Sequence, residues 1–200
     1  MILKILKKVI LCLDHRPIGF KYLKNNNNNI NMDSNGSNFN IYTDGACTNN
    51  GRKGSKCSIG IHFPENNEIK LEDISRVLKV PKPTNNVAEL TAILESMKKV
   101  KGIVYTPICI YTDSEYSLNV LTKWYPKWTE KDKESKKNVL LIKETYDLYV
   151  QLPVYLFHIK AHTNLKDEHS IGNAIADKLA TDALQNKFEI GGGNILKYFE

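Results

Sequence analysis

FNIYTDGACTNN, which begins at Phe39, holds the pattern from which the fold of this chain can be predicted. Phe39, Ile41 and Thr43 fall on one face of the stretch, while Tyr42 and Asp44 fall on the other. This alternation has the period of a half-buried β-strand, and the glycine that follows is typical of a break. The stretch therefore predicts a strand that delivers Asp44 where it ends.

The same pattern returns in ICIYTD, where a second predicted strand ends in Tyr111, Thr112 and Asp113. If the two strands lie side by side and parallel, their aspartates meet at one edge of the sheet, which is where open α/β sheets bind ligands. Two carboxylates that close repel each other, and a divalent metal ion is the simplest group that relieves the repulsion. The sequence thus indicates a metal site.

Composition favours one ordinary domain. The chain has 200 residues, of which 42% are hydrophobic and 25% charged, enough for a single core. Most of the formal charge of +6 lies in residues 1–24, which have six basic side chains and one acidic one. Global basicity is therefore no evidence of nucleic-acid binding by the folded part, for which a local patch is needed.

Two further features bear on the environment of the protein. Cys12, Cys47, Cys57 and Cys109 form no Cys-x-x-Cys pair, which favours separate thiols in a reducing compartment over a disulfide or zinc site. No hydrophobic run reaches the length needed to cross a membrane, so we expect no transmembrane segment. We expect the protein to be a monomer located inside the cell, in the cytoplasm or the nucleus.

The N-terminal 38 residues differ in composition from the rest. Residues 1–24 form an amphipathic, lysine-punctuated leader, open to interpretation as a transit peptide for mitochondria, a membrane-surface helix or an incidental extension. The asparagine-rich stretch 25–38 is typical of a disordered linker. We expect the folded domain to begin near Phe39.

The order of the remaining elements predicts a mixed sheet with helices packed on it. After the first strand we expect two extended segments at 58–63 and 69–80. A helix follows, starting near Asn86 and carrying Glu89 in its first turn. Considered without the other motifs, Glu89 is interpreted as completing a helix cap with Asn86. Beyond Asp113, the pattern predicts helices at 114–121, 138–150 and 173–185 and a strand at 154–159.

One stretch combines lysines with both tryptophans of the chain. Residues 123–143 hold seven lysines against three acidic residues, with Trp124, Tyr125 and Trp128 among them. A charged run is usually a solvated face, but bases and sugars pack on aromatic rings while lysines follow phosphates. The stretch is therefore a candidate nucleic-acid ridge.

Five strings in order, YTDGAC, TNNVAE, YTDSEY, KAH and IGNAIAD, resemble the successive signatures of the ribonuclease H family, cellular type 1. The resemblance spans about Phe39 to Gln185. It implies an α/β ribonuclease H-like fold, a five-stranded mixed sheet with helices on both faces. It also implies a catalytic domain at 39–186, preceded by the leader and linker of 1–38 and followed by a tail at 187–200.

The resemblance implies a set of catalytic residues. Asp44, Glu89, Asp113 and Asp177 match the metal-binding carboxylates, so Glu89 becomes an expected ligand instead of a cap. Four carboxylates with no thiolate or imidazole suit two Mg²⁺ ions, with Mn²⁺ as a substitute, and Asp177 early in the last helix would also gain from the helix dipole. His162 matches a histidine thought to assist proton transfer or release of product and metal. His158 and His169 lack such a match and are expected to be structural.

The implied substrate is an RNA–DNA hybrid, whose RNA strand is cut to leave 5′-phosphate and 3′-hydroxyl ends. The residues that match positions gripping RNA 2′-hydroxyls are Cys47, Asn49, Asn50, Asn85 and Asn86. Lys82, Thr84 and Asn138 resemble a pocket for a DNA phosphate, and Tyr116, Trp124 and Trp128 resemble the channel for the deoxyribose strand. Two alternatives remain: a catalytically silent hybrid-binding module, and a related-fold nuclease such as a transposase or junction nuclease.

Overall fold

The computed structural model describes residues 22–24, 38–65, 67, 69–161 and 166–185, with side chains from residue 38 onward. Most of the leader and linker, the C-terminal tail and His162 therefore lie outside the described residues. Within the described part, no helix is long and hydrophobic enough to span a bilayer.

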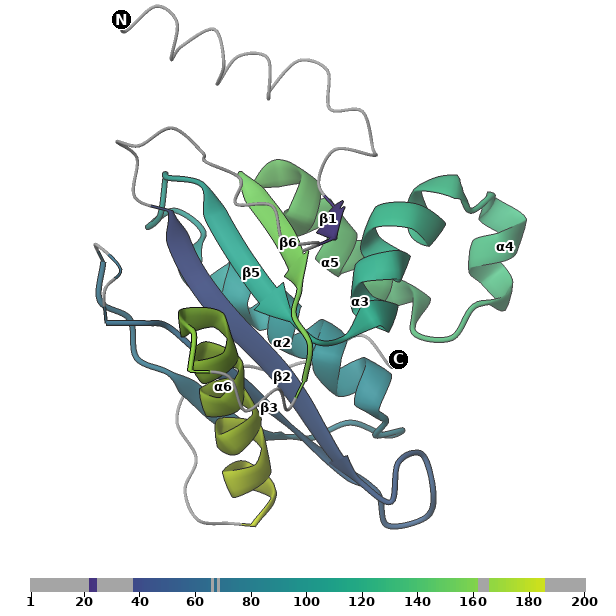
Figure 1. Ribbon diagram of the computed structural model, residues 1–200. Coiled ribbons are helices and arrows are strands. Elements are labelled where there is room, and N and C mark those ends of the chain that lie inside the picture. The colour runs from purple at the N-terminus through teal and green to yellow at the C-terminus, as the bar shows by residue number, and fades with distance from the viewer. Residues whose placement is uncertain (1–21, 25–37, 66, 68, 162–165, 186–200) are drawn as a thin grey trace, which may run out of the picture.

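A six-stranded mixed sheet forms the centre of the fold, in the order β1-β6-β5-β2-β3-β4 (Figure 1). β2, β3 and β4 pair antiparallel, whereas β1, β6, β5 and β2 pair in parallel. The five predicted strands are confirmed, and β1 adds a short sixth strand from the leader. The strands are β1 (Tyr22–Lys24), β2 (Phe39–Thr48), β3 (Lys56–His62), β4 (Ile74–Leu78), β5 (Ile108–Thr112) and β6 (Val154–His158).

Helices cover both faces of the sheet, as predicted (Figure 1). α2 (Asn85–Val100) packs on one face and contacts α5 (Val139–Gln151), while α6 (Glu168–Leu184) packs against β2, β3 and β4 on the other. The segment predicted as one helix at 114–121 is α3 (Glu115–Asn119), continued by the π-turn η1 (Val120–Trp124) and the 3₁₀-turn η2 (Tyr125–Lys127). Pro126 lies at the start of η2, where its missing N–H is tolerated. The short helix α4 (Glu130–Ser135) completes the set.

The alternation of β2 divides its side chains between two cores. Phe39 and Ile41 belong to the larger hydrophobic cluster, which also contains residues of α2 and α5. Tyr42 belongs to a smaller cluster that includes Ala176 of α6, and its ring stacks on Tyr111 of β5 with centroids 5.1 Å apart. The period of two in the sequence thus places one helix layer on each side of the strand.

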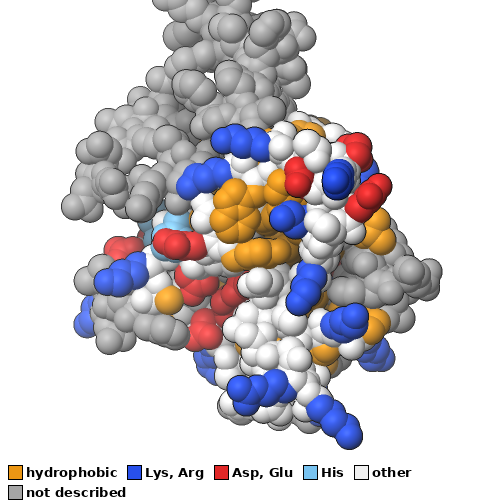
Figure 2. Space-filling model, turned by 90° about the vertical axis from the view of Figure 1, so that its right-hand side faces the viewer, with side chains coloured by type: hydrophobic (Ala, Val, Ile, Leu, Met, Phe, Trp, Pro, Cys, Tyr) orange, Lys and Arg blue, Asp and Glu red, His pale blue; other side chains and the backbone are white. Residues whose placement is uncertain are grey.

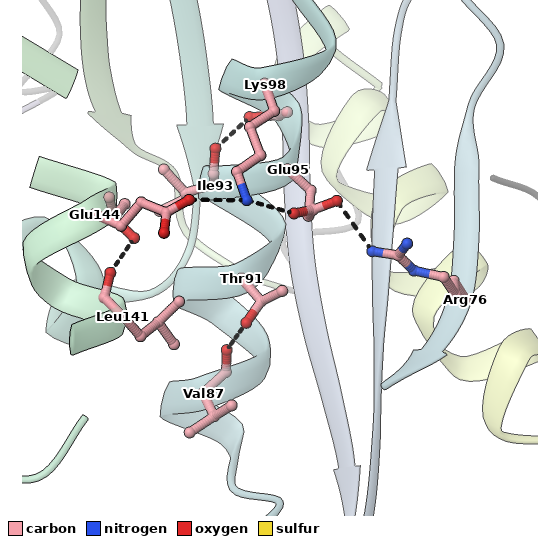
Figure 3. Close-up of polar contacts among 10 residues, drawn as sticks. Arg76, Val87, Thr91, Ile93, Glu95, Lys98, Leu141 and Glu144 are labelled. Carbon is pink, nitrogen blue, oxygen red and sulfur yellow. Dashed lines mark hydrogen bonds and ion pairs between the residues drawn. The ribbon is translucent and has the colours of Figure 1, made fainter. Parts of the chain in front are cut away.

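A chain of ion pairs fixes α2 between the sheet and α5 (Figure 3). Glu95 of α2 binds the guanidinium of Arg76 on β4 at 3.2 Å and the ammonium of Lys98 at 3.2 Å. Lys98 in turn lies 3.1 Å from Glu144 of α5. The Arg76 and Glu95 side chains are only 9% and 11% exposed, so this ion pair joins α2 to β4 at a position largely shielded from solvent.

The contact between α6 and β3 leaves no room for a side chain at Gly60. A methyl group there would overlap the carbonyl oxygen of Ala176 and the backbone nitrogen of Ala180. The neighbouring hydroxyls of Ser58 and Ser75 donate to the carbonyl oxygens of Ala180 and Leu179. The helix therefore lies unusually close to the strands.

Gly60→Ala is expected to lower the free energy of unfolding by about 3 kcal/mol, because α6 must move away from β3 to admit the methyl group. Urea denaturation measures this change. Lys56→Ala, at an exposed position of the same strand, is the control and should change the free energy by less than about 0.5 kcal/mol. Equal effects of the two substitutions would contradict the close contact.

Candidate metal centre

Asp44 and Asp113 are neighbours because β2 and β5 pair in parallel. Tyr42 lies opposite Tyr111 in this ladder, and each aspartate comes two residues later in its own segment. Asp44, Asp113 and Glu89 each offer an oxygen that lies within 4.8 Å of the others. β2 itself continues to Thr48 by pairing with β3, so the prediction that the strand breaks after Asp44 is wrong, although the two aspartates do meet.

Glu89 reaches the aspartates from α2. The helix begins at Asn85 with Thr84 as its cap, whose hydroxyl accepts from the backbone N–H of Val87 at 3.3 Å. Asn86 is therefore not the cap, and Glu89 lies beyond the first turn, free of a capping role. The backbone N–H of Gly45 donates to the carboxylates of both Asp44 and Glu89. A side chain at Gly45 would overlap the backbone at Ala88 and Glu89, so this glycine lets α2 approach β2.

Asp177 approaches the cluster from α6 but is not one of the three residues whose carboxylate oxygens lie within 4.8 Å of one another. Its charge nevertheless raises the pKa of Asp44, Glu89 and Asp113, so it lies near enough to act on all three. The helix begins at Glu168, five residues before the predicted start, because Asp167 caps it by accepting from the N–H groups of His169 and Ser170. Asp177 thus lies in the middle of α6, and the prediction that the helix N-terminus stabilises it is wrong.

Burial and mutual repulsion strongly disfavour the ionised form of the clustered carboxyl groups. Burial, together with the charges of Asp113 and Asp177, raises the pKa of Asp44 to about 7. Burial and the charges of Asp44 and Asp113 likewise hold the pKa of Glu89 well above its usual range. Burial also raises the pKa of Asp113. One oxygen of Glu89, Oε2, is buried without a hydrogen-bond donor.

This donor set fits a hard divalent cation. The clustered ligand atoms are all carboxylate oxygens, which Mg²⁺ and Mn²⁺ favour, and the unpartnered Oε2 of Glu89 lacks a positive neighbour that a cation would supply. A cation would also offset the repulsion that raises the carboxylate pKa values. Three of the four carboxylates expected to bind metal, Asp44, Glu89 and Asp113, therefore form a set that fits a divalent cation.

Asn173 joins the cluster although the sequence did not single it out. Its side chain donates to the carboxylate of Asp113, which lowers the pKa of that group, and its Oδ1 is buried without a partner. The available signal was its position one helical turn before Asp177, on the same face of α6. Of the two histidines expected to be structural, His158 lies 3.2 Å from the Asp113 carbonyl oxygen through Nε2, and His169 bonds the Tyr42 hydroxyl at 3.0 Å.

A groove of about 1170 Å³ lies on the face shown in Figure 2, where hydrophobic side chains are flanked by basic ones with acidic side chains nearby. Eight of the predicted substrate residues line the groove: Asn50, Lys82, Thr84, Asn86, Tyr116, Trp124, Trp128 and Asn138. The other three, Cys47, Asn49 and Asn85, are not part of its lining, although the N–H of Asn85 donates to Oδ1 of Asn50 at 3.0 Å.

The aromatic wall of the groove is held by ring contacts. Tyr116 meets Trp124 edge-on with centroids 6.1 Å apart, and the ammonium of Lys136 lies 5.5 Å from the centre of the Trp128 ring. Asn138, which precedes α5, has the left-handed φ of 59°, and its side chain bonds the Tyr116 hydroxyl. Asparagine is one of the few non-glycine residues that adopt this left-handed conformation readily.

The prediction of separate thiols is wrong for Cys47 and Cys57. These residues face each other across the antiparallel β2–β3 ladder, with Cα atoms 4.1 Å apart, and form a disulfide. The sulfur of Cys47 therefore cannot donate to a substrate hydroxyl as a thiol would. Cys109 is a free, buried cysteine, as expected.

Comparisons with known proteins agree with this geometry. The family model for RNase H matches residues 36–185. A probable ribonuclease H of Acanthamoeba polyphaga mimivirus is 36% identical over 67% of this chain and 61% of its own length, and the ribonuclease H of Orientia tsutsugamushi is 33% identical over 77% and 86%, respectively. The foamy viral protease-reverse transcriptase, solved with an RNA/DNA hybrid, superposes with a TM-score of 0.57 at 26% identity, over 72% of this chain and 20% of its own. This chain thus spans less than two thirds of the mimivirus relative.

The electrostatics of Asp44 predict how metal-free stability depends on pH. A folded pKa of about 7, above the ordinary 3.8, means that the folded state binds the proton more tightly, so stability falls as pH rises from about 4 to 7. Asp44→Asn removes this charge and should raise the free energy of unfolding at pH 8 by about 1–3 kcal/mol, with a much smaller change at pH 4, where Asp44 is close to its ordinary pKa. Thermal melts with a chelator present measure both values. A substitution that destabilises equally at both pH values would contradict the repulsion.

Proposed function

We propose, from the premise that this chain belongs to the RNase H family, that it is a metal-dependent endonuclease that cuts the RNA strand of RNA–DNA hybrids. The observation that carries the proposal is the convergence of Asp44, Glu89 and Asp113 from two adjacent strands and a helix. The basic, aromatic groove on the same molecule supplies a surface for a nucleic acid. The products would be 5′-phosphate and 3′-hydroxyl ends.

The four carboxylates, Asp44, Glu89, Asp113 and Asp177, are proposed to hold two Mg²⁺ ions, with Mn²⁺ as a substitute. When bound, such ions make the attacking water more acidic and neutralise charge on the leaving 3′ oxygen. The protein contributes the fixed positions of the oxygens: the Gly45 N–H orients the Asp44 and Glu89 carboxylates, and Asn173 orients that of Asp113. All of these groups belong to one chain, so a monomer suffices.

Substrate selection is proposed to depend on the polar lining of the groove. Asn50, Thr84 and Asn86 present side chains able to bond the 2′-hydroxyls of an RNA strand, which DNA lacks. Trp124 and Trp128 would pack against the sugars of the DNA strand, and Lys82 would contact one of its phosphates. For His162, which lies outside the described residues, we propose a role in proton transfer or in the release of product and metal.

Asp113→Asn is expected to lower kcat for a labelled RNA–DNA hybrid at least about 100-fold while leaving the fold intact, because the charge that holds the metal is lost without a change of shape. Cleavage assays with Mg²⁺ measure the loss, and circular dichroism checks the fold. Asp147→Asn is the matched control, since Asp147 is an exposed carboxylate of α5 paired only weakly with Lys143. It should retain full activity.

Three outcomes would contradict the proposal in different ways. Retained cleavage by Asp113→Asn would mean that the metal site is elsewhere. Binding of the hybrid by the unaltered protein without cleavage would favour a catalytically silent binding module. Cleavage of duplex DNA as fast as the hybrid would remove the role of the 2′-hydroxyl and favour a related nuclease.

A further inference from the structure

We propose that the turn between β2 and β3, residues 49–55, binds backbone phosphates of the nucleic acid through Arg52 and Lys53. This turn is called the basic turn below. The inference rests on the proposed function, which supplies a nucleic-acid substrate, and adds two contact residues, Arg52 and Lys53, that the motif matches do not include.

The basic turn has a well-defined backbone. The N–H of Arg52 donates to the Asn49 carbonyl at 2.8 Å, and that of Ser55 donates to the Arg52 carbonyl at 3.0 Å. Asn49, Gly51 and Gly54 have left-handed φ values of 51°, 73° and 80°, which curl the chain tightly. Glycine removes the steric cost at two of these three positions.

Hydrogen bonds also attach the basic turn to the segment that enters α2. The carbonyl oxygen of Pro83 accepts from the Gly51 N–H at 3.1 Å and from the Ser55 hydroxyl at 3.0 Å. The side chain of Asn50 accepts from the Asn85 N–H at 3.0 Å. The turn therefore keeps a fixed position beside Lys82 and Thr84, which line the groove.

Arg52 and Lys53 line the same groove as the two tryptophans. Figure 1 shows the turn between β2 and β3 at the lower right of the molecule, with α3 and α4 above it. Both side chains are exposed, and neither forms an ion pair with a carboxylate of the described residues. The groove lining, as far as the structure describes it, holds five basic residues and no acidic one: Arg52, Lys53, Lys82, Lys136 and Lys137.

This arrangement fits an extended polyanion. The groove of about 1170 Å³ exceeds the roughly 300–1,000 Å³ of small-molecule sites. From Asp44, β2 runs four more residues to Thr48 before the turn, a distance of about 13 Å at about 3.3 Å per residue. Phosphates of one strand follow each other at about 3.4 Å along the helix axis. A hybrid whose axis ran along β2 would place the basic turn about four phosphate steps from the one that is cut.

The test removes both charges of the basic turn in the full chain, as Arg52→Gln with Lys53→Gln. The control is Lys99→Gln with Lys101→Gln, two exposed lysines at the opposite end of α2. Binding of a hybrid is measured as a function of salt in an Asp113→Asn background with Mg²⁺, and KM and kcat are measured without that substitution. We expect the slope of log K against log salt to shrink by about 1–2, with the loss concentrated in KM.

The control pair should keep the slope, and Arg52→Lys with Lys53→Arg should restore it, because a phosphate contact needs charge and not a particular side chain. A slope unchanged from the control would overturn the inference. If the double variant fails to fold, Lys53→Gln alone decides, with an expected slope change of about 1. A wild-type protein that neither binds nor cuts the hybrid would instead overturn the proposed function.

Discussion

Repulsion among buried carboxylates is the constraint around which this structure is built. Asp44 is only 7% exposed, and burial with its acidic neighbours raises its pKa to about 7. Without a cation the cluster opposes folding, so the surrounding sheet and helices must supply the stability that holds it together. A divalent ion bound by the same carboxylates would offset their repulsion, so the cluster that destabilises the metal-free fold would stabilise the metal-bound one. Metal binding thus links folding to catalysis.

The rigid parts of the fold hold the carboxylates, and the irregular parts form the groove. Glycines at positions 45 and 60 let α2 and α6 approach the sheet closely from its two faces, and the ion pairs of Arg76, Glu95 and Lys98 fix α2 further along its length. The groove instead draws on the basic turn, the entry to α2 and the short turns around Trp124. Precise placement of the reacting centre and a broad contact surface thus come from different elements.

The sequence predicted the centre of the fold well because local patterns encode it. Period-two alternation and the repeated Tyr-Thr-Asp located Asp44 and Asp113. Glu89 was ambiguous from its helix alone, since a glutamate near an N-terminus serves as readily in a cap as in a ligand set. The start of α6 was missed because the helix, capped by Asp167, begins at Glu168, five residues before the predicted start at residue 173. The disulfide was missed because Cys47 and Cys57 are paired by the register of β2 and β3, which no local pattern states.

The position of the basic turn could not be predicted for a similar reason. Its charges were visible in the sequence, but its place in the groove depends on hydrogen bonds to Pro83 and Asn85, residues about thirty positions away.

Anomalous diffraction from crystals soaked in Mn²⁺ tests the central claim, that the carboxylate cluster binds a divalent metal ion, most directly. We expect a Mn²⁺ peak among the carboxylates of Asp44, Glu89 and Asp113. Mn²⁺ bound only elsewhere on the chain would contradict the account.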